Sequence, residues 1–170
     1  MPHRPPRFPV IDGFEFAAAG RSMRGAWPVE TFSRLGGLLH DNAGAVECEL
    51  RGVRDAHGRS GLELQLWATL ALTCRSCLGA VAVNVHEEAT LWLARSQAEI
   101  DAQQLAAQGP DSIVGSKDMV VRDLVEDELL LALPYAPRHE SCPAQGEASP
   151  TEQRKPFAGL RGLMRGRTRH

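Results

Sequence analysis

The run Leu62-Glu-Leu-Gln-Leu-Trp-Ala-Thr-Leu-Ala-Leu72 decides the fold class of this chain. Its apolar and polar side chains alternate with a period of two, the spacing of a strand that has one buried face and one solvent face. One face carries five leucines: Leu62, Leu64, Leu66, Leu70 and Leu72. The other carries Glu63, Gln65, Trp67 and Thr69. The run therefore predicts a long, half-buried β-strand.

Two neighbouring stretches repeat this alternation and predict a sheet. Residues 45–53 alternate, with Cys48 on the apolar face, where we expect it to be simply buried. Residues 54–61 are polar, contain two glycines and predict a hairpin loop. Residues 80–93 alternate again, and the polar group at 86–88 predicts a β-bulge. Consecutive strands with short connections favour an antiparallel meander.

The strongest helical pattern lies at 119–133. Val121, Val125 and Leu129 recur at i, i+4 and i+8, and Pro134 ends the pattern. Weaker patterns complete the assignment: a helix over 11–20 with Asp12 as N-cap and Gly20 as its stop, an extended segment at 24–29, helices at 31–40 and 97–108, and a loop at 109–117. The fold class that follows is α+β, a single domain in which an antiparallel sheet packs against helices.

Length, composition and charge exclude several classes of protein. The chain has 170 residues, is 43% hydrophobic and carries a net charge of −2, so it is no histone-like protein held to nucleic acid by overall charge. It contains no apolar run long enough to span a membrane and no signal-peptide pattern, which predicts a cytoplasmic protein that binds no membrane. We expect a flexible N-terminal arm at 1–10, a domain at 11–150 and a basic C-terminal tail at 151–170.

A metal centre is the first candidate site. Cys74-Arg-Ser-Cys77 lies between two predicted strands, and two thiolates at this spacing on a tight turn suit one Zn²⁺ in a zinc-knuckle-like turn. His139 and Cys142 follow the last helix and would complete a closed Cys₃His set that holds a structural zinc ion. Free thiols in a turn and a redox dithiol remain open as alternatives, and Cys48 is a rival fourth ligand.

Two oppositely charged segments form the second candidate. Residues 118–152 carry a net charge of −6, and residues 153–170 carry +6. On the acidic helix we expect a solvated face with Asp123, Glu126 and Asp127, which would bind a basic partner or hold the tail, and Glu128 beside the apolar stripe. The tail residues that would bind RNA phosphates are Arg154, Lys155, Arg161, Arg165, Arg167 and Arg169. A solubilising tail, or one bound to a membrane surface, remains the alternative.

Several motifs together resemble one known family. The stretches are Gly25-Ala-Trp-Pro-Val29 and Arg34-Leu35, then Leu72-Thr-Cys-Arg-Ser-Cys-Leu78, then Leu124-Val-Glu-Asp-Glu-Leu-Leu-Leu-Ala-Leu-Pro134 with Pro137, His139 and Cys142, and finally Pro156-Phe-Ala-Gly-Leu160. In this order they resemble the YceD family, the large ribosomal RNA subunit accumulation proteins. The Arg/Gly-rich end at 161–170 departs from the resemblance.

The resemblance implies a non-enzymatic factor that supports synthesis, processing or stability of 23S ribosomal RNA. Its partners would be 23S rRNA or a precursor, or a ribosomal protein of the large subunit. The family supplies no catalytic residue to carry over. The rival function is a zinc- or thiol-dependent redox or regulatory protein built on Cys74 and Cys77.

Overall fold

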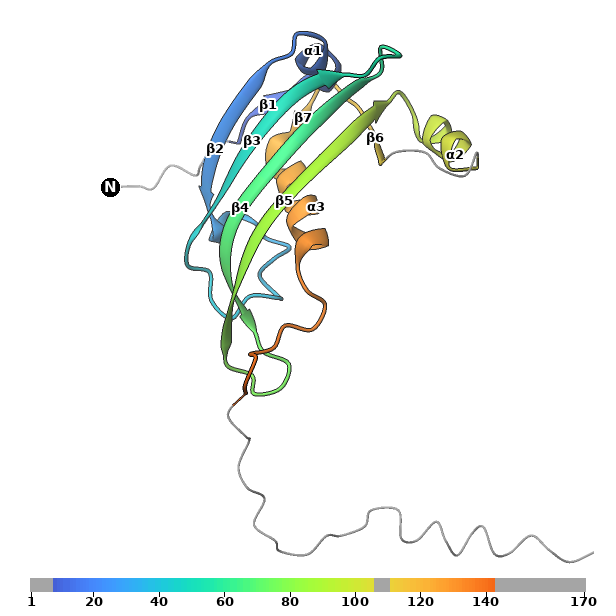
Figure 1. Cartoon of the computed structure of the whole chain (residues 1–170). Coiled ribbons are helices and arrows are strands. Elements are labelled where there is room, and N and C mark those ends of the chain that lie inside the picture. Colours follow the sequence, from blue (N-terminus) through green and yellow to red (C-terminus); the bar gives the residue numbers. More distant parts are fainter. Residues whose placement is uncertain (1–7, 106–110, 143–170) are drawn as a thin grey trace, which may run out of the picture.

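A five-stranded sheet forms the centre of the protein (Figure 1). The computed structural model describes residues 8–105 and 111–142. The sheet has the order β2 (Ser22–Pro28), β3 (Ala45–Arg54), β4 (Ser60–Thr73), β5 (Ala80–Ala94) and β6 (Ser112–Val114). Strands β2 to β5 are an antiparallel meander, and β6 runs parallel to β5. The predicted α+β class and the meander are therefore confirmed, with a short parallel edge strand added.

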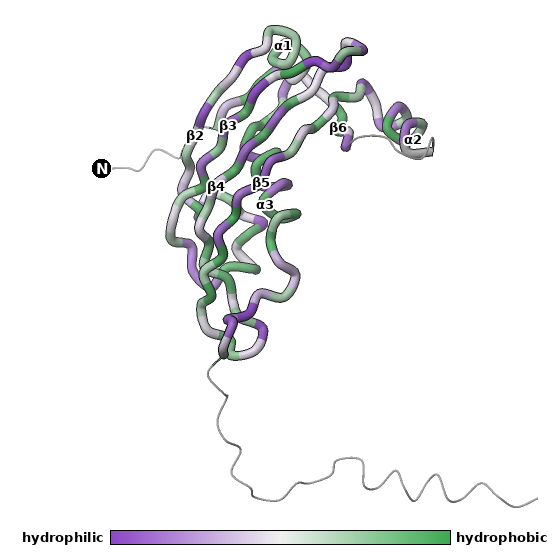
Figure 2. Tube along the Cα trace, in the orientation of Figure 1, coloured by the Kyte–Doolittle hydropathy of each residue, from purple (hydrophilic) through white to green (hydrophobic). Residues whose placement is uncertain are grey.

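Alternating side chains divide the sheet into a buried face and a solvent face. On β4 the five leucines of the opening run are at most 2% exposed. The neighbouring strand β3 adds Val46, Cys48 and Leu50 to the same buried face. Trp67, on the other face of β4, is 37% exposed and stacks on His86 of β5. Figure 2 shows the same alternation of hydrophobic and hydrophilic positions along the strands. The core consequently lies on one side of the sheet only.

The bulge predicted at 86–88 is wrong. The register of β4 and β5 runs without interruption from Gly61 opposite Trp92 to Thr73 opposite Ala80. Strict alternation then places Glu87 opposite Leu66, on the buried face of the sheet, where it is partly exposed. Part of the Glu87 side chain stays in contact with solvent, so no extra residue is needed to turn it outward.

Two further local predictions are wrong. Residues 31–40 form no α-helix: a 3-10 turn η1 (Val29–Thr31) is followed by successive turns that bury Phe32 and Leu35. Gly36 and Gly37 disfavour a helix there, and burial of the two apolar side chains decides the path. Residues 109–117 include β6 instead of being loop throughout, because a strand of three residues is too short to give a periodic signal.

Helix α1 (Gly13–Ala18) packs across one end of the sheet and was predicted at this place. The Asp12 side chain accepts a hydrogen bond from the Glu15 N–H at 3.0 Å, and Gly20 adopts a φ of +57° just after the helix. The helix backbone at Phe16 and Ala17 lies directly against Gly52 of β3. A side chain at position 52 would occupy space that this backbone fills.

Helix α3 (Val121–Ala132) covers the buried face of the sheet (Figure 1). Val121, Val125 and Leu129 are fully buried, as the spacing predicted, and the helix ends before Pro134. Its first two predicted residues instead form β7 (Met119–Val120), which pairs with β1 (Val10–Ile11). Helix α2 (Gln97–Leu105) confirms the helix predicted there and lies at the β6 edge.

The N-terminal residues that the structure describes are packed against the domain. The Phe8 ring lies 5.4 Å from that of Trp27, and Pro9 O accepts a hydrogen bond from the Val121 N–H. Most of the predicted arm and the whole predicted tail lie outside the described residues, so those boundaries stay predictions. In the described part of the chain, no helix has the length and apolar character needed to cross a membrane.

Candidate metal centre

Three cysteines and one histidine from distant parts of the sequence meet at the β4–β5 end of the sheet. Cys74 and Cys77 lie in the connection between these strands, and His139 and Cys142 lie in the segment after α3. Their candidate donor atoms all lie within 4.8 Å of one another. In the described part of the chain, no second group of three or more such ligands comes together. The structure thus assembles the four residues that the sequence singled out.

The β4–β5 turn aims the first two sulfurs. The Leu78 N–H donates to Cys74 O at 3.0 Å, and the Cys74 N–H donates to Gly79 O at 2.9 Å, which closes a tight loop at the end of the hairpin. The Ser76 N–H donates to Cys74 Sγ at 3.4 Å. Backbone N–H groups directed at a sulfur stabilise its thiolate form, which is the form that binds metal.

Two polar contacts hold the second pair of ligands over this turn. The Arg75 N–H donates to Pro137 O at 2.9 Å, which fixes the segment after α3 on the hairpin. His139 Nε2 lies 2.8 Å from Ala80 O. Because a carbonyl oxygen only accepts hydrogen bonds, Nε2 carries the proton. In the neutral ring Nδ1 is then unprotonated, and its lone pair, which can bind a metal, faces the sulfurs. An imidazole oriented by a backbone carbonyl is the usual second layer of a metal site.

The donor set and its spacing fit Zn²⁺. Cys74 Sγ lies 3.5 Å from Cys142 Sγ, and His139 Nδ1 lies 3.4 Å from Cys77 Sγ and 3.8 Å from Cys142 Sγ. Zn–S bonds of about 2.3 Å in a tetrahedron place two sulfurs roughly 3.8 Å apart. Three sulfurs and one imidazole nitrogen are a common structural zinc set, and they leave no open coordination position.

Cys74 differs in acidity from its neighbours. Hydrogen bonds from backbone N–H groups, that of Cys77 foremost, lower the pKa of the Cys74 thiol to about 5. The hydrogen bond with the Cys74 sulfur, followed by burial, raises the pKa of the Cys142 thiol, because both favour the protonated form. The hydrogen bond to Ala80 O, followed by that to Cys74, raises the pKa of His139. A bound cation would replace the protons on Cys142 and His139, so metal binding at this site releases protons.

Cys48 is not part of the cluster. It is 2% exposed on the buried face of β3, and burial raises the pKa of its thiol to about 11. The expectation that Cys48 is a buried apolar side chain is confirmed. As a rival fourth ligand it is excluded by its position, since it is not among the four residues whose donor atoms meet.

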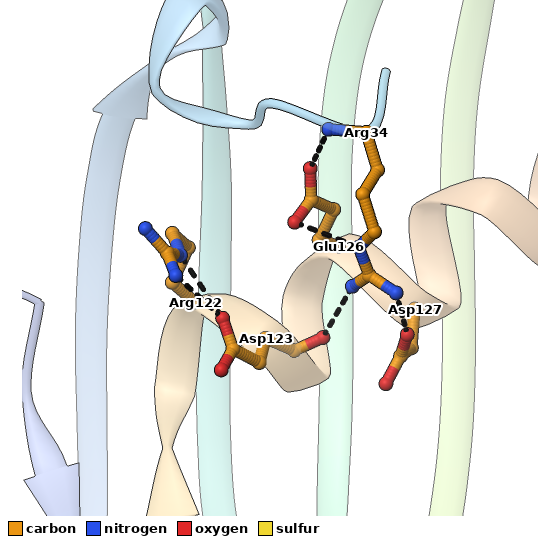
Figure 3. Close-up of polar contacts among 5 residues, drawn as sticks. All are labelled: Arg34, Arg122, Asp123, Glu126 and Asp127. Carbon is orange, nitrogen blue, oxygen red and sulfur yellow. Dashed lines mark hydrogen bonds and ion pairs between the residues drawn. The ribbon is translucent and has the colours of Figure 1, made fainter.

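The predicted solvated acidic face is wrong at Glu126. This residue is 2% exposed, and its Oε1 accepts from the Arg34 N–H at 2.6 Å while Oε2 accepts from Arg34 Nε at 3.0 Å (Figure 3). The Arg34 guanidinium also contacts the Asp127 carboxylate and the backbone oxygen of Asp123. Arg34 thus fastens the 32–39 segment to α3. The sequence offered one signal for burial of Glu126, its place directly after buried Val125. Its partner Arg34 could not be identified, because it lies 92 residues away.

The remaining predicted contact residues divide into two groups. Asp123 and Asp127 are exposed on α3, where a basic partner can reach them, and their role as a binding surface stays a prediction. Glu128, expected beside the apolar stripe, is half-buried, and desolvation followed by Glu87 and Asp111 raises its pKa. All six predicted RNA-binding residues of the tail lie outside the described residues.

Fold and site together define a class of protein: a small α+β domain with a candidate four-ligand metal centre that joins its hairpin end to its C-terminal segment. A family model described as large ribosomal RNA subunit accumulation protein YceD matches residues 62–164. The chain therefore belongs to the YceD family. Neither the curated proteins nor the solved structures contain a significant match to it.

Proposed function

We propose that the protein is a non-enzymatic factor that supports the synthesis, processing or stability of 23S rRNA by binding RNA or a large-subunit ribosomal protein. The observation that carries this proposal is the family match, whose description names accumulation of large ribosomal subunit RNA and whose range includes all four candidate metal ligands. Such a factor would act in the cytoplasm, where bacterial ribosomes are assembled.

In this proposal the metal centre has a structural role. A zinc ion held by Cys74, Cys77, His139 and Cys142 would supply a cross-link between the hairpin and the segment after α3. Cys142 precedes the predicted basic tail at 151–170 by nine positions, so the centre would anchor the chain shortly before the tail. A fixed starting point lowers the entropy lost when the tail binds a partner.

Charge supplies the binding energy in this proposal. The residues that would contact RNA phosphates are Arg154, Lys155, Arg161, Arg165, Arg167 and Arg169. Each phosphate contact would contribute roughly −0.7 to −0.9 to the slope of log affinity against log salt. Exposed Asp123 and Asp127 would receive a basic ribosomal protein, whose cations would compete with Arg122 and Arg34 for these two carboxylates. Glu126 has no part in this contact, because Arg34 occupies both of its carboxylate oxygens.

Depletion of the protein in cells tests the proposal directly. We expect the ratio of 23S to 16S rRNA to fall, and a full chain with the six tail bases changed to Gln to restore it less well than the wild type. Crosslinking in cells, followed by sequencing of attached RNA, should recover large-subunit RNA. A normal rRNA ratio after depletion, or turnover of a substrate by the purified chain, would contradict the proposal.

A redox function is the second candidate, and the low pKa of the Cys74 thiol favours it. Against it stands the arrangement of the thiols. Cys74 and Cys77 lie between two strands and do not begin a helix, and Cys74 Sγ contacts Cys142 Sγ at 3.5 Å, a sulfur outside the Cys-x-x-Cys pair. Thiol titration with and without a chelator distinguishes the two. Thiols that become reactive only after zinc removal support the structural centre, and one reactive thiol in metal-free protein supports redox chemistry.

A further inference from the structure

A groove of about 220 Å³ lies beside the metal centre and has no role in the function proposed above. Its walls come from three places: the turns before β3, the end of β4 with the metal-binding turn, and the segment after α3. Six of the lining residues carry the argument: Leu38, Leu72, Arg75, Leu78, Leu133 and Tyr135. Arg75 is the one charged residue in the lining, so the groove suits apolar side chains.

Large apolar side chains at this groove are exposed. Tyr135 is 94% exposed, Leu78 67% and Leu38 42%. Single exposed apolar residues are ordinary on protein surfaces, but a group of them around one concavity marks a place where another apolar group binds.

The backbone conformation of Leu78 is a second unusual feature of this groove. Leu78 has a φ of +62° and is the one non-glycine residue with a positive φ among those that the structure describes. Leucine disfavours this left-handed conformation, which glycine or asparagine adopts more easily. The Leu78 side chain lies mostly in solvent and contributes little to the core, so it is available for contact with an apolar group that binds in the groove.

We propose that this groove is the docking site of the chain's own segment 156–164, which inserts the apolar face formed by Phe157, Leu160, Leu163 and Met164. These four residues fall on one side of a helical turn pattern. The family match begins before the groove residues of β4 and ends at residue 164, so it includes this apolar segment and excludes the last six residues.

The connection between domain and segment has the required reach. Cys142 Sγ lies 3.5 Å from that of Cys74, in the same turn that supplies Arg75 and Leu78 to the groove. Phe157 follows Cys142 by 15 positions (157 minus 142). Fifteen residues span at most about 50 Å when fully extended, and a short tether holds its segment at an effective concentration of about millimolar. Weak apolar contacts suffice for docking under this condition.

Charge at the rim is compatible with a basic segment. Helix α3 has no basic residue in its last turn, and Leu133 and Pro134, just after it, line the groove. Carbonyl groups at a helix C-terminus favour nearby cations, which Arg161 can supply. Arg75 has the same sign as the segment, but its side chain is exposed and can turn toward solvent. Docking through the apolar face would leave the tail's other bases free to bind phosphates.

A photo-crosslinking amino acid in place of Tyr135 tests the docking in the full-length, zinc-loaded chain. Tyr135 is the only tyrosine of the chain and is almost wholly exposed, so the change leaves the core intact. We expect crosslinks to residues 156–164 within one molecule. They should persist at about 1 M salt, where the Debye length is about 3 Å, because the contact is apolar. The same crosslinker at Trp67, on the open face of the sheet, should give no such product.

Two matched double variants decide the role of the apolar face. Phe157→Asp with Leu160→Asp should lower the crosslink yield by about tenfold. The free energy gained by burying two large apolar side chains exceeds the amount that corresponds to a tenfold change in an equilibrium constant. Ala158→Asp with Gly162→Asp changes the charge equally on the other side of the segment and should keep the yield. Three outcomes would overturn the docking, whatever the rRNA measurements show. In a mixture of isotopically distinct copies, crosslinks could form only between copies. Crosslinked products could lie outside 156–164, or the first variant could show no loss of yield.

Discussion

The carboxylate of Glu126 accepts hydrogen bonds from both the backbone N–H and the Nε of Arg34, 92 residues earlier in the chain. Glu126 is buried, whereas Arg34 reaches solvent and also contacts Asp127 (Figure 3). Because an unpaired carboxylate is costly to bury, this contact holds the turns after η1 in place on α3. Those turns bury Phe32 and Leu35 and supply Leu38 to one wall of the groove.

Removing the charge of Glu126 should therefore destabilise the domain. We expect Glu126→Gln to lower the free energy of unfolding by about 1.5–3 kcal/mol, the usual range for a hydrogen bond to a charged group. Asp127→Asn is the matched control, because it lies one position further on the same helix and contacts the same arginine from an exposed site. Its effect should stay below about 1 kcal/mol. Urea unfolding measures both, and equal losses would contradict a special role for the buried carboxylate.

The metal centre should bind one zinc ion per chain. Cys142→Ser should reduce the zinc content of the purified protein and lower its unfolding midpoint, whereas Cys48→Ser, at a buried cysteine outside the cluster, should keep the zinc. At a free zinc concentration of about 100 times Kd, binding stabilises the fold by about 2.7 kcal/mol. Metal analysis and thermal unfolding with and without a chelator measure this. Full zinc content in Cys142→Ser would remove Cys142 from the ligand set.

Zinc affinity should fall as the pH falls. The pKa values of the Cys142 thiol and His139 imidazole are raised, so both groups hold their protons more strongly than isolated side chains, and the metal must displace them. We expect zinc to be released between neutral and mildly acidic pH, in a competition measurement with a chromophoric chelator. An affinity that does not change with pH would contradict binding through these groups.

The close contact of α1 with β3 should make Gly52 intolerant of any side chain. In Gly52→Ala the new methyl group meets the backbone of Phe16 and Ala17, which cannot rotate away as a side chain can. We expect a loss of about 1–3 kcal/mol or more. Gly37→Ala is the control, because no atom lies near its added methyl group and its φ is not positive. A comparable loss in both variants would argue against the close approach.

Glu128 should weaken the fold as the pH rises. Burial, Glu87 and Asp111 raise its pKa above the ordinary value of 4.5. The folded state therefore binds this proton more tightly than the unfolded state, and the stability that it contributes is lost as the pH rises from below 4.5 through the folded pKa. Glu128→Gln should raise stability at pH 7, by less than about 1 kcal/mol because the group is partly exposed, and flatten this pH dependence. Glu63→Gln on the open face should do neither.

The periodic parts of the fold could be predicted from local sequence. Strands β3, β4 and β5 and helix α3 are long enough for alternation or helical spacing to repeat several times, and their buried residues agree with it. Edge strands β6, β1 and β7, of two or three residues, carry no such signal. The turns at 32–39 resemble a weak helix in composition, and only the burial of Phe32 and Leu35 shows otherwise.

What the sequence by itself determined was the one-sided sheet, the helix that covers it and the identity of the four candidate metal ligands, since alternation, helical spacing and cysteine spacing are local properties. What only the tertiary structure decided was which distant groups meet. It placed Glu126 in the core beside Arg34, Glu87 on the buried face, and Leu78 in the lining of the same groove as Tyr135. Contacts of this kind depend on how elements pack. The spacing of side chains along one helix or strand does not tell which residue of another element they will contact.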